Sequence, residues 1–70
     1  MSMQYYYKYA EIDLETNMCI GVHTFTYSAE DDPRFVEIPV YDEEYIFKYY
    51  INGSWYEDPD GTIPWTSSLL

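Results

Sequence analysis

The only histidine and the only cysteine, His23 and Cys19, are the residues of this chain best suited to nucleophilic chemistry. In a thiol mechanism the imidazole must lie within hydrogen-bond reach of the sulfur. The two residues belong to one extended run and fall on the same predicted strand face, too far apart along the strand for direct contact. Cys19 is more simply explained as a small core hydrophobe. No serine, lysine or acid lies in a nucleophile motif, so the sequence predicts a protein without enzymatic activity or cofactor.

The DPDG run at residues 58–61 places the alternate carboxylates Asp58 and Asp60 as at the start of a calcium-binding loop. It lacks the third acidic position and the distal bidentate glutamate of such a loop. A single cysteine also excludes an internal disulfide and a cysteine-based zinc cluster. We therefore expect a plain turn at residues 58–61 and no bound metal.

Thirteen acidic residues against three basic ones give the chain of 70 residues a net charge of −10. Each phosphate contact needs a cation, so this balance argues against binding to nucleic acid or to an anionic membrane. The charge either keeps a tyrosine-rich chain soluble or complements a basic partner. In the second case the acids could imitate the phosphates of DNA and inhibit a host defence nuclease. The runs that could do so are Glu30-Asp31-Asp32, Asp42-Glu43-Glu44, and Glu57-Asp58 with Asp60.

The length of the chain is close to the lower limit at which a hydrophobic core folds unaided. A small sheet leaves one face and two edges uncovered, so we expect a partner or self-association to cover them. The N-terminal residues MSMQYYYKYAE lack the basic start and apolar run of a signal peptide, and no apolar stretch is long enough to span a bilayer. We expect a soluble protein made in a reducing cytoplasm, with no membrane partner.

Hydrophobic alternation and turn residues predict an all-β fold: a small antiparallel β-meander of two hairpins with at most one short helical turn. The first hairpin pairs residues 3–12 with 18–27, and the second pairs 48–51 with 54–57 across Asn52-Gly53. Between them lie an acidic loop at 28–34, a short strand at 35–40, and one helical turn capped by Asp42. Both hairpins are expected to share one sheet. Residues 1–58 form the β domain and residues 59–70 a C-terminal tail.

The rings around the Asn52-Gly53 turn are divided between core and surface. A type I′ turn at this pair places Tyr50 and Trp55 on one face of the hairpin and makes Tyr49 and Tyr56 a second cross-strand pair. So small a domain has few other large apolar groups, which favours a core role for Trp55. The candidate core residues are Ile12, Ile20, Val22, Ile38, Tyr50 and Trp55.

Ten tyrosines are more than a core of this size can enclose, so several must be exposed or lie in an interface. The candidate interaction surface consists of Tyr5, Tyr7, Tyr49, Tyr56 and Trp65. These rings either bury against another protein, with Trp65 and the last residues as a peg into a neighbour, or form a flat platform that stacks on a cell-wall glycan. The acidic charge does not require a glycan, which favours the protein interface.

Three short motifs resemble the pattern of a small β-rich module of phages and prophages of Gram-positive bacteria, which is encoded near tail and baseplate genes or appended to tail-fibre proteins. They are YAEID at residues 9–13, IPV at 38–40, and K-x-Y-x-N-G-x-W at 48–55. Ile20, Gly21 and Val22 match the second strand of the pattern, and the likeness runs from Gln4 to Asp58. The chain departs from the pattern at Phe47, where a glycine is expected, and in the tail around Trp65.

This resemblance implies a non-enzymatic structural or accessory protein of the virion, such as a tail, fibre or baseplate component. Its partners would be other virion proteins or further copies of itself, and it would occur in the virion or in the host bacterial cytoplasm during assembly. Two other hypotheses stay open: an acidic DNA-mimic inhibitor that binds a basic host nuclease, and an aromatic module that binds a cell-wall glycan.

Overall fold

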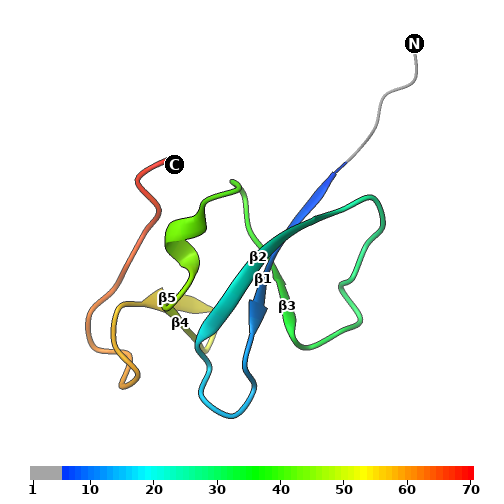
Figure 1. The fold of residues 1–70 in the computed structure, drawn as a ribbon. Coiled ribbons are helices and arrows are strands. Elements are labelled where there is room, and N and C mark those ends of the chain that lie inside the picture. The colour runs from blue at the N-terminus through cyan, green and yellow to red at the C-terminus, as the bar shows by residue number, and fades with distance from the viewer. Residues whose placement is uncertain (1–5) are drawn as a thin grey trace.

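The computed structural model of the chain describes residues 6–70 and consists mainly of β-strands (Figure 1). Its elements are β1 (Tyr7–Ile12), β2 (Cys19–Phe25), β3 (Phe35–Glu37), the 3-10 turn η1 (Glu43–Tyr45), β4 (Tyr49–Ile51) and β5 (Ser54–Tyr56). The prediction of an all-β fold with two hairpins and one short helical turn is confirmed.

The local turn chemistry explains where both hairpins close. Asn17 in the first turn and Asn52 and Gly53 in the second have φ angles of 66°, 51° and 86°, the left-handed region that Asn and Gly tolerate. Asp42 caps η1, because its carboxylate accepts a hydrogen bond of 2.9 Å from the backbone N–H of Glu44. The predicted turn at Asn52-Gly53 and the predicted cap at Asp42 are therefore correct.

The strands form two sheets, so the expectation of one shared sheet is wrong. The first sheet has the order β2-β1-β3, in which β3 pairs with β1, and the second contains β4 and β5 (Figure 1). One bridge, between Met18 and Tyr49, joins them. The chain enters β4 through Phe47, whose φ of 76° turns the backbone away from an extended path, so pairing with β2 does not continue.

A β-bulge in β2 changes which residues of that strand face the core, compared with the sequence-based prediction. Glu11 pairs with Gly21 and Ile12 pairs with Cys19, so Ile20 is an extra residue with no partner on β1. The bulge turns Cys19 into the core, where it is fully buried, and leaves Ile20 48% exposed. The assignment of Ile20 to the core is therefore wrong, because the alternation that predicted it is interrupted at this residue.

The core lies between the first sheet and the segment that contains η1 and the second sheet. Its fully buried members are Ala10, Ile12, Cys19, Ile38 and Tyr45. The predicted core residues Ile12 and Ile38 are among them, and Val22, Tyr50 and Trp55 are partly buried against them. The sequence did not indicate Tyr45, which is the last residue of η1 and is 2% exposed.

The C-terminal segment packs against β5. The N–H of Trp65 donates to the carbonyl of Trp55 at 3.0 Å, and the N–H of Glu57 donates to Ile63 at 2.8 Å. The Trp65 ring meets Tyr45 edge-on at 4.9 Å between centroids. Trp65, predicted as a surface residue or a peg into a neighbour, is therefore a partly buried residue at the margin of this chain's own core.

Candidate functional site

Aromatic side chains cover the face of the first sheet that points away from the core. Side chains alternate along a strand, so Tyr7 and Tyr9 on β1 lie opposite to the core residues Ala10 and Ile12. Antiparallel register places the partners of these tyrosines, Phe25 and His23, on the same face. We call this surface the aromatic face, and it consists of Tyr7, Tyr9, His23, Phe25, Tyr27 and Phe35.

Tyr9 is the centre of the aromatic face and is 2% exposed. Its ring contacts Phe25 and Phe35 at centroid distances of 5.6 and 6.1 Å. Its hydroxyl accepts a hydrogen bond of 2.9 Å from the N–H of Ala29, in the loop after β2. Tyr9 therefore anchors that loop on the sheet, as expected for a buried tyrosine whose polar end must find a partner.

Three rings form a stacked row along β2 and the residues that follow it. Phe25 is parallel to His23 at 5.7 Å and to Tyr27 at 5.1 Å, with interplanar angles of 8° in both cases. Both faces of the middle ring, Phe25, are therefore turned toward its two neighbours. Tyr27, 62% exposed, is the ring at the outer end. A flat glycan platform needs several open ring faces side by side, so a row in which the rings stack on one another favours a protein partner over such a platform.

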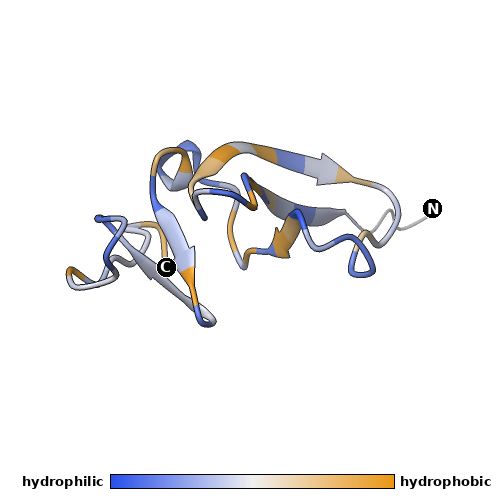
Figure 2. Cartoon of the chain, turned by 90° about the horizontal axis from the view of Figure 1, so that it is seen from below, coloured by the Kyte–Doolittle hydropathy of each residue, from blue (hydrophilic) through white to orange (hydrophobic). Residues whose placement is uncertain are grey.

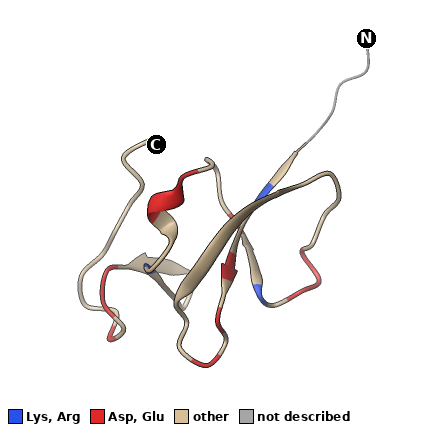
Figure 3. Ribbon diagram, viewed as in Figure 1, with Lys and Arg blue, Asp and Glu red and all other residues tan. Residues whose placement is uncertain are grey.

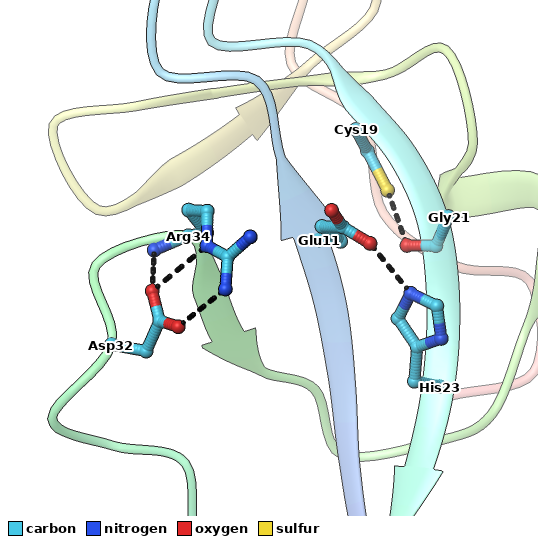
Figure 4. Close-up of polar contacts among 6 residues, drawn as sticks. All are labelled: Glu11, Cys19, Gly21, His23, Asp32 and Arg34. Atoms are coloured by element: carbon cyan, nitrogen blue, oxygen red, sulfur yellow. Dashed lines mark hydrogen bonds and ion pairs between the residues drawn. The ribbon is translucent and has the colours of Figure 1, made fainter.

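The row is held at its inner end by a hydrogen bond between the side chains of His23 and Glu11, on the two strands of the hairpin. The Nε2 atom of His23 lies 2.8 Å from Oε1 of Glu11 (Figure 4). Gly21 is the residue opposite Glu11, and a Cβ at this position would lie 3.2 Å from Nε2 of His23. The missing side chain of Gly21 thus provides the space in which the imidazole reaches Glu11.

A hollow with a volume of about 570 Å³ opens beside the outer end of the row. Its lining includes the rings of Phe25, Tyr27 and Phe35 and the charged residues Asp31, Asp32 and Arg34. Two guanidinium nitrogens of Arg34 donate to the two carboxylate oxygens of Asp32 at 2.8 and 3.2 Å (Figure 4), and this hydrogen bonding lowers the pKa of Asp32. Asp31 is exposed and has no hydrogen-bond partner within residues 6–70. The hollow therefore combines rings with an unpaired negative charge.

Each of the three acidic runs uses one carboxylate for its own local structure. Asp32 binds Arg34, Asp42 accepts from the hydroxyl of Ser67, and Asp58 accepts from the N–H groups of Thr62 and Ile63. Hydrogen bonds from Ser67 and from Thr62 are the main reason that the pKa values of Asp42 and Asp58 are lowered. The acids are also spread over separate segments (Figure 3). Thirteen acidic residues suggested a possible DNA mimic, but acids that are separated in this way are less suited to imitating a continuous row of phosphates.

Cys19 and His23 lie on opposite faces of β2, because the bulge at Ile20 reverses the alternation between them. The expectation that they share a face is therefore wrong, and they cannot form a thiol–imidazole pair in this fold. Burial raises the pKa of the Cys19 thiol, whereas a reactive cysteine needs a lowered pKa.

The predicted interaction residues are distributed over several parts of the fold. Tyr7 belongs to the aromatic face, whereas Tyr49 and Tyr56 are half-buried partners across the second hairpin. Trp65 packs on the core, and Tyr5 lies outside the described residues. Phe25, Tyr27 and Phe35 were not among the residues predicted to form a surface. The alternation His23-Thr24-Phe25-Thr26-Tyr27 was the available signal for two of them.

Residues 58–61 form a turn, in which the N–H of Gly61 donates to the carbonyl of Asp58. Residues 6–70 contain no group of three or more His, Cys, Asp or Glu side chains arranged to hold a metal ion. In the same part of the chain, no helix has the length and apolar character needed to cross a membrane. Comparisons with protein-family models, with curated proteins and with solved structures found no match.

Proposed function

We propose that this chain is a non-enzymatic structural or accessory protein of a bacteriophage, in the tail, fibre or baseplate, and that it docks on another virion protein through the aromatic face. The observation that carries the docking role is the exposed end of the ring row at Tyr27, with the hollow beside it. Exposed aromatic side chains beside a concavity are typical of protein interfaces. The phage assignment is supported by the resemblance of the YAEID, IPV and K-x-Y-x-N-G-x-W motifs.

The chemistry of the hollow indicates the kind of segment that it receives. A lining that combines aromatic rings with the acidic residue Asp31 suits the side chain of an arginine or lysine, whose hydrocarbon part packs on rings while its charge meets an acid. The net charge of −10 attracts a basic segment over a longer range. The partner is therefore a virion protein with an exposed basic segment, and binding should weaken as the salt concentration rises.

The test uses the phage or prophage that encodes the chain. Particles are purified by density gradient and probed for this protein, once with the natural sequence and once with Tyr27→Ser. Tyr27 is 62% exposed, so this change leaves the fold intact. Tyr41→Ser is the matched control, because Tyr41 is also exposed and lies outside the aromatic face.

The proposal predicts that the chain is present in particles, that Tyr41→Ser is incorporated normally, and that Tyr27→Ser is depleted. Absence of the natural chain from purified particles would contradict the virion role. Equal incorporation of the two variants would contradict docking through the aromatic face.

A further inference from the structure

The outer edge of β2 carries backbone groups that nothing in the described chain pairs. On the side away from β2, Lys8 and Ile12 of β1 are bonded to the two residues that flank β3. The carbonyl of Lys8 accepts from the N–H of Ile38 at 2.9 Å, and the N–H of Ile12 donates to the carbonyl of Arg34 at 2.7 Å. Backbone groups alternate in direction along a strand, so Tyr7, Tyr9 and Glu11 turn theirs toward β2. Their partners Gly21, His23 and Phe25 therefore bind β1. The intervening residues, Val22 and Thr24, direct their N–H and C=O groups outward.

The free part of this edge has defined ends. At its start Cys19 is already paired on the outer side, since its N–H donates to Lys48 and its carbonyl accepts from Phe47, at 2.7 and 2.8 Å. At its end the chain bends after Phe25. Residues 21–25 remain between these limits, and within residues 6–70 no backbone hydrogen bond reaches Val22 or Thr24 from outside β1. Figure 2 shows β2 along the upper margin of the molecule, with no ribbon beyond it.

Residues 21–25 carry neither the charged side chains nor the proline by which many proteins prevent strand pairing, and the β-bulge at Ile20, which is another such device, precedes this stretch. Natural edge strands are usually protected by charged side chains, especially lysine, or by proline. β2 has the sequence CIGVHTF, without an acid, a lysine, an arginine or a proline, and Figure 3 shows it free of charged residues. Two copies of a chain with a net charge of −10 repel each other. They can approach most closely along a strand without acidic side chains, and β2 is such a strand.

We propose that a second copy of this chain pairs with residues 21–25 of β2, antiparallel and related by a two-fold axis. An axis at His23, the middle of the free stretch, pairs the whole stretch with itself. Val22 then faces Thr24 of the second copy, and both outward residues of each chain are hydrogen-bonded. This pairing involves neither Ile20, which is bulged, nor Cys19, whose outward backbone groups already bind Phe47 and Lys48.

The pairing joins the three-stranded sheets of two copies into one continuous sheet. Residues directly opposite each other in an antiparallel pair share a face, so the aromatic faces of the two copies become one surface. His23 comes next to His23 of the second copy, and Phe25 comes opposite its Gly21. A small domain with one sheet face outside its core gains buried area in this way. The inference concerns a different surface from the docking of Tyr27 and does not depend on the proposed function.

The first test is the mass of the natural protein by light scattering across concentration, combined with amide hydrogen exchange. We expect a dimer of the 8.4 kDa chain at high concentration. The amides of Val22 and Thr24 should be protected in the dimer and should exchange quickly after dilution, whereas the amide of Tyr9, bonded within the chain, stays protected in both. Because like charges oppose association, added salt should strengthen the dimer.

The second test is Thr24→Pro, which removes an outward N–H without breaking a bond to β1, with Thr24→Val as a matched control that keeps the N–H. The proline variant should dimerise about tenfold more weakly or worse, and the valine variant should resemble the natural chain. A protein that is monomeric at every concentration would overturn the proposal. So would a dimer in which the amides of Val22 and Thr24 exchange freely, or one that tolerates Thr24→Pro.

Discussion

Phe47 offers a sharp test of backbone strain, because its φ of 76° lies in the left-handed region while the residue is 69% exposed. A left-handed conformation lowers the stability of the folded state by about 1–2 kcal/mol for a residue with a Cβ, and glycine has no such penalty. Glycine in turn loses about 0.5–1 kcal/mol more chain entropy on folding than alanine does. Glycine at position 47 should therefore give a protein about 0.5–1 kcal/mol more stable than alanine at that position.

Both substitutions remove the same ring, so their difference isolates the strain. Full burial of a phenylalanine stabilises by about 1.5–3 kcal/mol, and with 69% of the residue exposed only a minor part of that is lost. Phe47→Ala should thus be somewhat less stable than the natural chain, and Phe47→Gly about equal to it. The hydrogen bond from the N–H of residue 47 to the carbonyl of Cys19 persists in both variants.

The assay is unfolding in denaturant, with the midpoint compared at constant slope, and thermal unfolding as a second readout. A difference of about 0.5–1 kcal/mol corresponds to roughly 2–8 °C in Tm for a domain of this size. At an ordinary extended position the order would be reversed, since glycine is the less stable residue there. A glycine variant that is less stable than the alanine variant would refute the assignment of strain to Phe47.

Two further predictions concern buried hydrogen bonds. Tyr9→Phe removes the acceptor of the Ala29 N–H, so the free energy of unfolding should fall by about 1–2 kcal/mol, while Tyr27→Phe, at an exposed ring, should have little effect. The lowered pKa of Asp42, held mainly by the Ser67 hydroxyl, gives stability that is fully present above the unfolded pKa of about 4 and is lost as the pH falls through the folded value. Denaturation at pH 6 and pH 3 should show that Ser67→Ala lowers stability more at pH 6. An equal loss at both pH values would argue against this linkage.

Local chemistry in the sequence was sufficient for the turns and for the fold class. Asn17, Asn52 and Gly53 take the left-handed φ angles that their residue types permit, and Asp42 caps η1. The faces of β1 are also local, because the extra residue of the bulge belongs to β2: Tyr7 and Tyr9 lie on one face and Ala10 on the other, as simple alternation requires. Each of these features depends on residues within a few positions of one another.

Features that depend on distant residues were not predictable in the same way. The alternation in β2 predicted Ile20 in the core. The bulge at Ile20 moves the residues that precede it to the opposite face of the sheet, and no residue type in the sequence indicates that a bulge occurs there. The sequence likewise could not show that Trp65 returns to pack on Tyr45.

For the aromatic face, too, some features follow from the sequence and others only from the tertiary structure. The sequence by itself determined an acidic, tyrosine-rich β protein with more rings than its core can hold. Only the tertiary structure decided which rings gather, because Tyr9, Phe25 and Phe35 come from three strands that meet through the order β2-β1-β3. Strand order and register are set by the packing of the opposite, apolar face against η1 and the second sheet, and that packing is a property of the whole chain.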